Sequence, residues 1–146
     1  MAGLLRPEAY DHPAYDLVLR DTHISLVRLA GRFAYKLKKP VNLGFVDFST
    51  LERRAADCAE EVRLNRRLCP DTYLGVVQVV QRDGSFHVGG KGGKETPVEP
   101  AVRMRRLPEA GMLPSPLARG ELHPSLIQRI AGRLAAFTQP PQPVKV

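Results

Sequence analysis

One six-residue segment constrains the fold of this chain more than any other. In residues 33–38, Phe-Ala-Tyr-Lys-Leu-Lys, aromatic and aliphatic side chains alternate with an alanine and two lysines. A period of two is typical of a β-strand whose two faces meet different surroundings. We therefore expect Tyr35 and Leu37 to pack into a core, while Lys36 and Lys38 project together from the opposite face of the strand.

Four further segments also predict strands, because they are rich in β-branched, aromatic or aliphatic residues and are bounded by turn residues. The five predicted strands are residues 15–20, 25–29, 33–38, 73–81 and 99–107. Ala30-Gly31-Arg32 predicts a tight hairpin, in which Gly31 can adopt a positive φ. The last two strands are joined by Arg82-Asp83-Gly84 and by a polar stretch with four glycines at 89–93, which predicts a mobile loop.

A helix is predicted between the third and fourth strands. Ser49-Thr50-Leu51-Glu52 has the spacing of a capping box, so the helix is expected to begin there, with Ser49 as the cap, and to end before Pro70. At about 100° per residue, one apolar stripe contains Leu51, Ala55, Cys58, Val62 and Cys69. Glu61 falls within this apolar arc, whereas Glu60 falls among arginines. Because a buried carboxylate needs a partner, Glu61 is expected to pair with a lysine of the neighbouring strand.

The chain is long enough for one hydrophobic core. Its 146 residues, 43% hydrophobic and 25% charged, lie in the ordinary globular range. We expect an α+β fold in which residues 1–107 form a five-stranded antiparallel sheet with one packed helix. Residues 108–146 are expected to contain a linker, a helix opening at Pro124 and a proline-rich tail.

The net charge, the cysteines and the lack of long apolar segments indicate which ligands and which cellular compartment to expect. The net charge of +7 would attract nucleic acid, anionic lipid or phosphorylated small molecules. No segment resembles a signal peptide or the roughly 20 apolar residues of a membrane helix, so a cytoplasmic protein without a membrane partner is expected. Cys58 and Cys69 are too far apart on the predicted helix to form a disulfide. The four histidines lack the spacing of metal ligands, so no metal site is expected.

A strand lysine paired with a glutamate on the next helix is the arrangement with which kinase-like sites hold ATP phosphates. The lysine neutralises phosphate charge, and the glutamate holds the lysine in position. The order Phe-Ala-Tyr-Lys parallels the Val-Ala-Ile-Lys order of protein kinases and favours Lys36, although Lys38 shares its face and can take the same role. The alternative is that Lys36, Lys38 and Lys39 form the solvated face of an edge strand.

Several strings, in order along residues 12–137, resemble one family. They are Thr-His-Ile-Ser-Leu-Val at 22–27, Tyr-Lys-Leu-Lys-Lys-Pro-Val at 35–41, the segment 44–54, Glu-Val-Arg-Leu-Asn-Arg-Arg-Leu at 61–68 and Val-Arg-Met-Arg-Arg-Leu at 102–107. Together they are similar to the N-terminal part of bacterial aminoglycoside phosphotransferase-like proteins, many of which are fused to a C-terminal P-loop ATP-binding domain.

The resemblance implies a protein-kinase-like small lobe that binds ATP. Lys36 would contact phosphates, with Lys38 as the alternative, and Glu61 would be the partner of the lysine. Ser25 would belong to the loop that covers the phosphates, and Met104 to Leu107 would form the hinge beside the adenine. Apart from the resemblance, Arg103, Arg105 and Arg106 are candidate anion ligands, although arginines at a strand end are more often solvated charges.

The resemblance also implies that the enzyme is incomplete. Similar proteins continue into a large lobe with a His-Gly-Asp-type catalytic loop and a metal-binding aspartate, whereas no aspartate follows residue 107 here. We expect a truncated small-molecule phosphotransferase, with Thr-Gln-Pro-Pro at 138–141 marking a truncation or frameshift. Alone it would bind ATP weakly and catalyse nothing, and it would need magnesium only with a complete large lobe. A separately encoded large lobe and self-association are the expected partnerships, through Met104, Leu107 and Phe137.

A basic module that binds nucleic acid or a protein partner is the alternative function. It would use an arginine-rich helix face formed by Arg53, Arg63, Arg66 and Arg67. The aromatic residues do not form a stacking platform for bases, which argues against nucleic acid as the ligand.

Overall fold

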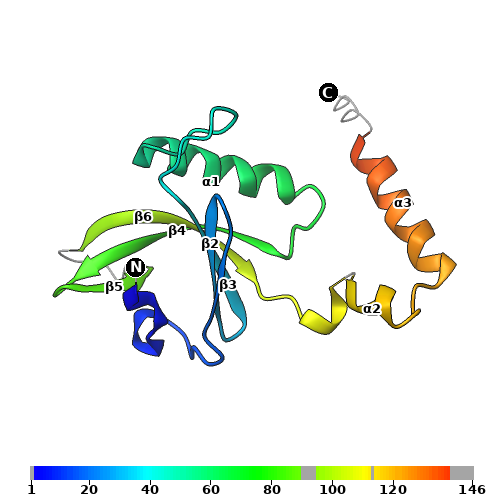
Figure 1. Ribbon diagram of the computed structural model, residues 1–146, viewed down its shortest axis with the longest axis horizontal. Helices are drawn as coiled ribbons and strands as arrows, with labels where there is room; N and C mark the ends of the chain where they lie inside the picture. Colours follow the sequence, from blue (N-terminus) through cyan, green and yellow to red (C-terminus); the bar gives the residue numbers. More distant parts are fainter. Residues whose placement is uncertain (1, 90–94, 113, 139–146) are drawn as a thin grey trace, which may run out of the picture. The chain divides into compact units, whose positions relative to one another are not determined.

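The computed structural model describes residues 2–89, 95–112 and 114–138. The chain divides into two compact units, Met1–Arg106 and Leu107–Val146. The first unit contains an antiparallel sheet and a 15-residue helix, and the second contains two short helical segments followed by another 15-residue helix (Figure 1). Each unit is described by itself below.

The sheet of the first unit has six strands in the described part of the chain. In spatial order they are β1 (Val18–Asp21), β2 (Ser25–Ala30), β3 (Phe33–Lys38), β6 (Thr96–Arg105), β4 (Tyr73–Arg82) and β5 (Ser85–Val88). All neighbouring strands pair antiparallel. The predicted α+β class with an antiparallel sheet is therefore confirmed. The central position of β3, between β2 and β6, means that its lysines do not lie on an edge strand.

The predicted number of five strands is wrong, because β5 was assigned to a loop. Asp83 and Gly84 have φ values of 47° and 75°. Two consecutive residues with positive φ form the two-residue turn that best matches the twist of a hairpin. This turn returns the chain along β4, and Val88 then pairs with Val79 inside the core. Of the predicted loop at 89–93, residues 90–93 lie outside the described residues.

The first hairpin depends on Gly31, as the sequence predicted. Gly31 has a φ of 53°, and a Cβ built on it would lie 2.6 Å from the carbonyl oxygen of Pro13. Its N–H donates to the carbonyl oxygen of Tyr15 at 2.7 Å. The first strand starts at Val18 rather than at Tyr15, and Asp16 before it has a positive φ of 49°.

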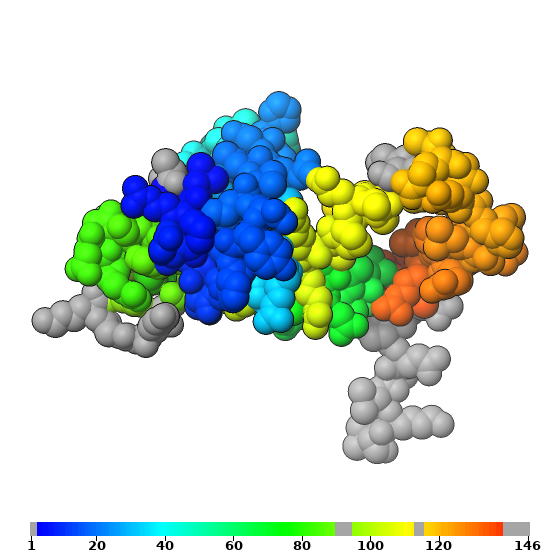
Figure 2. Space-filling model, turned by 90° about the horizontal axis from the view of Figure 1, so that it is seen from below, coloured from blue at the N-terminus to red at the C-terminus, as the bar shows by residue number. Residues whose placement is uncertain are grey.

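Tyr35 and Leu37 lie in the core on one face of the sheet, each 1% exposed. The N-terminal residues cover this core through two short 3-10 helices, η1 (Ala2–Leu5) and η2 (Pro7–Ala9). Leu4 is fully buried, and the hydroxyl of Tyr10 donates to its carbonyl oxygen at 2.8 Å. Figure 2 shows this dark blue segment beside the green hairpin of β4 and β5, with which it is in contact.

Helix α1 (Leu51–Asn65) covers the other face of the sheet, where Cys58 and Val62 pack against Val102. Thr50 is its N-cap and accepts from the Arg53 N–H, whereas the Ser49 hydroxyl donates to Asp47. The predicted cap at Ser49 is therefore wrong by one residue. The helix also ends earlier than the apolar stripe suggested, so the exposed Cys69 lies beyond it.

The second unit contains η3 (Glu109–Gly111), α2 (Pro114–Ala118) and α3 (Pro124–Thr138). The final helix opens at Pro124, as predicted. Its apolar residues Ile127, Ile130 and Leu134 are exposed. The proline-rich tail at 139–146 lies outside the described residues. Among the residues that the structure describes, no helix combines the length and apolar character needed to cross a bilayer.

Candidate functional site

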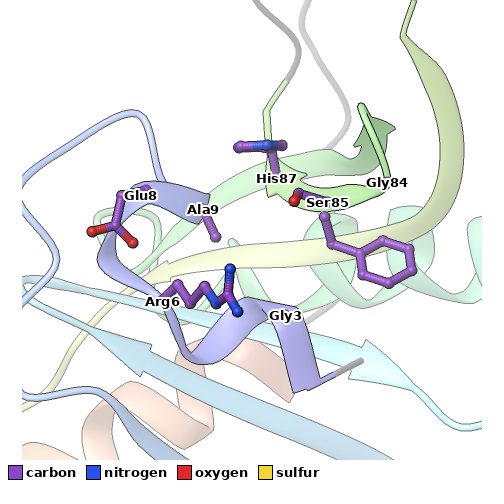
Figure 3. Close-up of a pocket in the computed structure, with 8 residues that line it drawn as sticks. Gly3, Arg6, Glu8, Ala9, Gly84, Ser85 and His87 are labelled. Atoms are coloured by element: carbon purple, nitrogen blue, oxygen red, sulfur yellow. The ribbon is translucent and has the colours of Figure 1, made fainter.

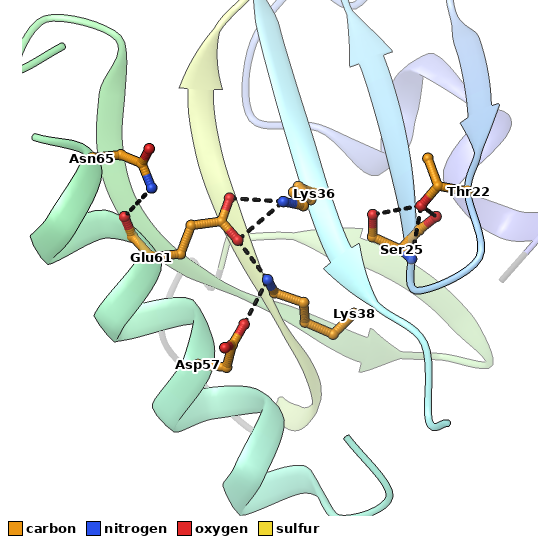
Figure 4. A network of polar contacts seen from close by, with 7 residues as sticks. All are labelled: Thr22, Ser25, Lys36, Lys38, Asp57, Glu61 and Asn65. Carbon is orange, nitrogen blue, oxygen red and sulfur yellow. Dashed lines mark hydrogen bonds and ion pairs between the residues drawn. The ribbon is translucent and has the colours of Figure 1, made fainter. Parts of the chain in front are cut away.

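Four charged side chains meet where β3 faces α1, and we call them the lysine–carboxylate cluster: Lys36, Lys38, Asp57 and Glu61 (Figure 4). Lys36 Nζ lies 3.0 Å from Glu61 Oε1 and 3.1 Å from Oε2. Lys38 Nζ lies 2.5 Å from Glu61 Oε2 and 2.6 Å from Asp57 Oδ2. The contact expected between Glu61 and a strand lysine is therefore present, and both lysines take part in it.

Strand alternation and helix periodicity place these groups together. Lys36 and Lys38 are two residues apart on β3, so they share the face that α1 covers. Asp57 and Glu61 are four residues apart on α1, so they are neighbours on one side of the helix. Asp57 was not predicted as a site residue, although its spacing from Glu61 was a signal that could have identified it.

The two lysines differ strongly in exposure. The side chain of Lys38 is 5% exposed and that of Lys36 is 26% exposed. Lys38 Nζ also lies 5.3 Å from the ring centre of the buried Phe48. The side chain of Lys38 is thus enclosed, whereas that of Lys36 is partly accessible to solvent.

The cluster keeps Glu61 ionised and Lys38 protonated at neutral pH. Burial alone would raise the pKa of the Glu61 carboxyl, but hydrogen bonds from Lys38 and Lys36 outweigh it and hold this pKa below its ordinary value. Burial alone would likewise lower the pKa of Lys38, and the hydrogen bonds to Asp57 and Glu61 raise it above its ordinary value. Each group is thus stabilised in its charged form by its partners.

Separate contacts fix both ends of α1 against the sheet. In its first turns, Arg54 donates to Glu99 of β6 at 2.6 Å and 2.9 Å, and to the carbonyl oxygen of Phe48 at 2.8 Å. At its C-terminal end, Arg66 Nε donates to the carbonyl oxygen of Tyr73 in β4 at 2.7 Å. The carboxylate of Glu61 is therefore carried by a helix anchored on both sides of it.

Met104 lies on the same face of the sheet as the cluster. It pairs with Ala34 of β3, and it packs against the apolar residues beneath α1. Leu29 of β2 is the other neighbour of Ala34. Leu29, Ala34 and Met104 thus form an apolar row across three neighbouring strands. Ala34, at its centre, lies two residues before Lys36 on β3.

Arg105 and Ser25 are not brought into the cluster. Arg105 pairs with Phe33 on the opposite face, because consecutive strand residues alternate. It lines a separate hollow of about 310 Å³ with Arg32, Leu74 and Arg106. Ser25 is buried beside Lys38 in register, but its hydroxyl contacts Thr22 Oγ1 at 2.9 Å, within the turn between β1 and β2. Figure 4 shows the hydroxyl of Ser25 directed to Thr22 and not to the carboxylates of the cluster.

The arginine-rich side of α1 is largely occupied by contacts within the protein. Arg53 pairs with Asp47, and Arg63 pairs with Glu60 at 2.6 Å. Arg66 donates to backbone carbonyls of β4, as described above. Arg66 keeps its full positive charge, because the carbonyl oxygens that it contacts are neutral.

Another hollow, of about 430 Å³, lies between the N-terminal 3-10 helices and β5 (Figure 3). Its lining includes Arg6 and Glu8 from the N-terminal segment and Ser85, Phe86 and His87 from β5. No residue of β3 or α1 lines this hollow, so it is distinct from the lysine–carboxylate cluster. In the described residues, no group of three or more histidine, cysteine or acidic side chains could hold a metal ion.

Comparison with known proteins finds curated relatives in mycobacteria. The chain is 36% identical over 131 residues to "Uncharacterized protein Rv2004c" of Mycobacterium tuberculosis and to "Uncharacterized protein Mb2027c" of Mycobacterium bovis. The match covers 88% of this chain and 24% of each relative. No protein-family model and no solved structure matches the chain. The chain thus spans about a quarter of the length of the curated relatives it matches.

Proposed function

We propose that this chain is the ATP-binding small lobe of a kinase-like, aminoglycoside phosphotransferase-like enzyme that acts on a small molecule in the cytoplasm. The single observation that carries the proposal is the contact of Lys36 Nζ with both carboxylate oxygens of Glu61, at 3.0 Å and 3.1 Å. It joins a central strand to the packed helix, and the Lys36 side chain remains 26% exposed. Such a group can neutralise phosphate charge when a nucleotide binds.

The apolar row beside Lys36 supports a nucleotide as the ligand. A nucleotide needs an apolar surface for its base and a cation for its phosphates. Ala34 lies two residues before Lys36, and its neighbours Leu29 and Met104 are only partly buried. We assign the base to this row and the phosphates to Lys36.

Phosphoryl transfer would require groups in addition to the lysine–carboxylate cluster. The reaction needs positioned groups on both sides of the transferred phosphoryl, including a base for the acceptor hydroxyl and carboxylates for magnesium. The described residues contain no cluster suited to a metal ion. In this proposal a complementary large lobe supplies catalysis and magnesium binding, and this chain supplies nucleotide binding.

Calorimetric titration of the purified chain with ATP tests the proposal. Lys36→Met should weaken ATP binding by at least about tenfold, because a hydrogen bond to a charged group is worth about 1.5–3 kcal/mol. Arg63→Met is the matched control, since it removes a positive charge from the solvent side of α1. ATP binding that is absent, or equally reduced by both variants, would refute the proposal.

A further inference from the structure

We infer that the hollow beside Arg105 is a second binding site, which takes the phosphate monoester group of a small organic molecule. The hollow has a volume of about 310 Å³, and we call it the arginine hollow. It is lined by Arg32, Phe33, Leu74, Arg105 and Arg106. The inference goes beyond the proposed function, because neither the lysine–carboxylate cluster nor the apolar row contributes a lining residue.

The fold brings three arginines together at one end of the sheet. Arg32 lies in the turn between β2 and β3, and Arg105 is the last residue of β6. Phe33 pairs with Arg105, so this turn and the end of β6 are neighbours. The backbone N–H of Arg106 then donates to the carbonyl oxygen of Arg32 at 2.9 Å. Residues far apart in the sequence thus surround one hollow.

The arginine hollow and the proposed nucleotide surface lie on opposite faces of the sheet. Phe33 belongs to the core on the face that the N-terminal residues cover, and Arg105 shares this face because it pairs with Phe33. Lys36 and Met104 lie on the other face, toward α1, because side chains alternate along a strand. A ligand in the hollow is therefore separate from the lysine–carboxylate cluster.

Acidic side chains do not balance the charge of the hollow. In the described part of the chain, Arg32, Arg105 and Arg106 take part in no ion pair. Arg106 Nη1 donates instead to the carbonyl oxygens of Asp16 at 3.2 Å and Gly31 at 3.4 Å. Because these acceptors are neutral and an arginine stays protonated, the hollow keeps its positive charge.

The ring of Phe33 gathers further positive charge beside the hollow. The guanidinium carbon of Arg32 lies 5.0 Å from the ring centre, and that of Arg103 lies 4.0 Å from it. Stacking on an aromatic ring leaves both groups charged. Nε of Arg103 is buried without a hydrogen-bond partner among the described residues. Like charges near one ring repel each other, and an anion in the hollow would offset this repulsion.

These features favour a compact anion with two negative charges. The guanidinium fork matches the oxygen atoms of a phosphate. A phosphate monoester carries about −1.5 to −2 charges at pH 7, whereas a carboxylate or a sulfate ester is singly charged. The volume of about 310 Å³ is near the lower end for small-molecule pockets and leaves space for a small organic group. Leu74, 36% exposed, offers that group an apolar wall.

Calorimetric titration of the purified chain with phenyl phosphate tests the inference. We expect saturable binding with a Kd of about 1 mM or tighter. Arg105→Gln should weaken it at least about tenfold, because a charge-assisted hydrogen bond is lost. Arg63→Gln is the matched control, since Arg63 is an exposed arginine of α1. Absence of saturable binding, or equal losses in the two variants, would overturn the inference.

Backbone amide NMR of the unmutated chain gives a test that needs no variant. Phenyl phosphate should shift the signals of Arg32, Leu74 and Arg105 and leave those of Lys36 and Glu61 in place. Shifts at Lys36 and Glu61 alone would place the phosphate at the lysine–carboxylate cluster, and this inference would then be wrong while the proposed function stands. Conversely, a failure of ATP to bind leaves the arginine hollow unaffected, because the two sites share no residue.

Three further probes test the chemical class of the ligand. Phenyl sulfate, which has the same shape and one negative charge, should bind at least several-fold more weakly than phenyl phosphate. Equal binding would show that the hollow does not select a doubly charged anion. A phosphoserine peptide and a single-stranded oligonucleotide should each bind no more tightly than phenyl phosphate. Tighter binding of either one would make the ligand a macromolecule and overturn the assignment to a small molecule.

Discussion

Arg54 and Glu99 form a two-point ion pair, with Nε 2.6 Å from Oε1 and Nη2 2.9 Å from Oε2, that joins the first turns of α1 to β6. Both residues are buried, although they lie 45 positions apart in the sequence. Because the pair fixes the end of the helix that precedes the lysine–carboxylate cluster, it contributes to the placement of Asp57 and Glu61. Its removal is the most direct way to test how firmly α1 is held.

Glu99→Gln should destabilise the protein by about 3–5 kcal/mol, since it leaves the buried Arg54 guanidinium without a counter-charge. The free energy of unfolding from urea denaturation measures this loss. Glu60→Gln is the matched control, because Glu60 pairs with Arg63 on the exposed side of the same helix. That exposed pair should contribute less than about 1 kcal/mol. Equal losses in the two variants would contradict the structural role of Arg54 and Glu99.

The cluster predicts a specific dependence of stability on pH. The pKa of Glu61 is lowered in the folded protein, so the unfolded chain binds more protons between the two pKa values. The contribution of Glu61 is therefore fully present above the unfolded pKa, near 4.3, and is lost as pH falls through the lower folded pKa. Glu61→Gln should be less stable than the unmutated chain at pH 7, and the difference should shrink toward pH 3. Denaturant midpoints at several pH values measure it, and a constant difference would argue against the assignment.

The two thiols should differ in reactivity. Burial raises the pKa of the Cys58 thiol to about 11, and Cys58 is fully buried beneath α1, whereas Cys69 is exposed. A thiol reagent at pH 8 should modify Cys69 within minutes and spare Cys58, because the thiolate is the nucleophile. Peptide mass spectrometry identifies the modified residue. Cys69→Ser should abolish the fast reaction in the folded protein and leave one reactive thiol in urea.

Gly31→Ala should destabilise the first hairpin by more than about 1 kcal/mol. The new Cβ would lie 2.6 Å from the carbonyl oxygen of Pro13, in addition to the strain of a positive φ. Gly84→Ala is the control, because Gly84 also has a positive φ but no heavy atom within 4 Å of the added Cβ. Thermal unfolding should show a larger loss for Gly31→Ala. Equal losses would mean that the backbone at Pro13 moves away from the added Cβ and removes the close contact.

The local patterns of the sequence predicted the centre of the site well. Alternation in residues 33–38 gave the bounds of β3 and the shared face of its lysines. Helical periodicity separated Glu61 from Glu60, because only Glu61 falls on the side of α1 that meets the sheet. The same alternation, applied to β6, would have shown that Met104 and Arg105 cannot both face one ligand.

The features that the sequence did not predict depend on distant contacts or on backbone geometry. The pairing of Arg54 with Glu99 requires the register between α1 and β6, which no local pattern specifies. Strand β5 was missed because its Asp-Gly turn was grouped with the polar residues that follow it. The packing of η1 and η2 was missed because three apolar residues, Leu4, Ala9 and Tyr10, have no regular spacing along so short a segment.

The covering of the sheet by the N-terminal residues has a practical consequence for work with this protein. Leu4 and Tyr10 supply part of the interior, although they precede the first strand by many positions. A shortened fragment that starts at Val18 would expose to water the apolar face of the sheet that contains Tyr35 and Leu37, and it should be prone to aggregation. Purification handles are therefore better placed at the opposite terminus, and deletion series should leave the first ten residues intact.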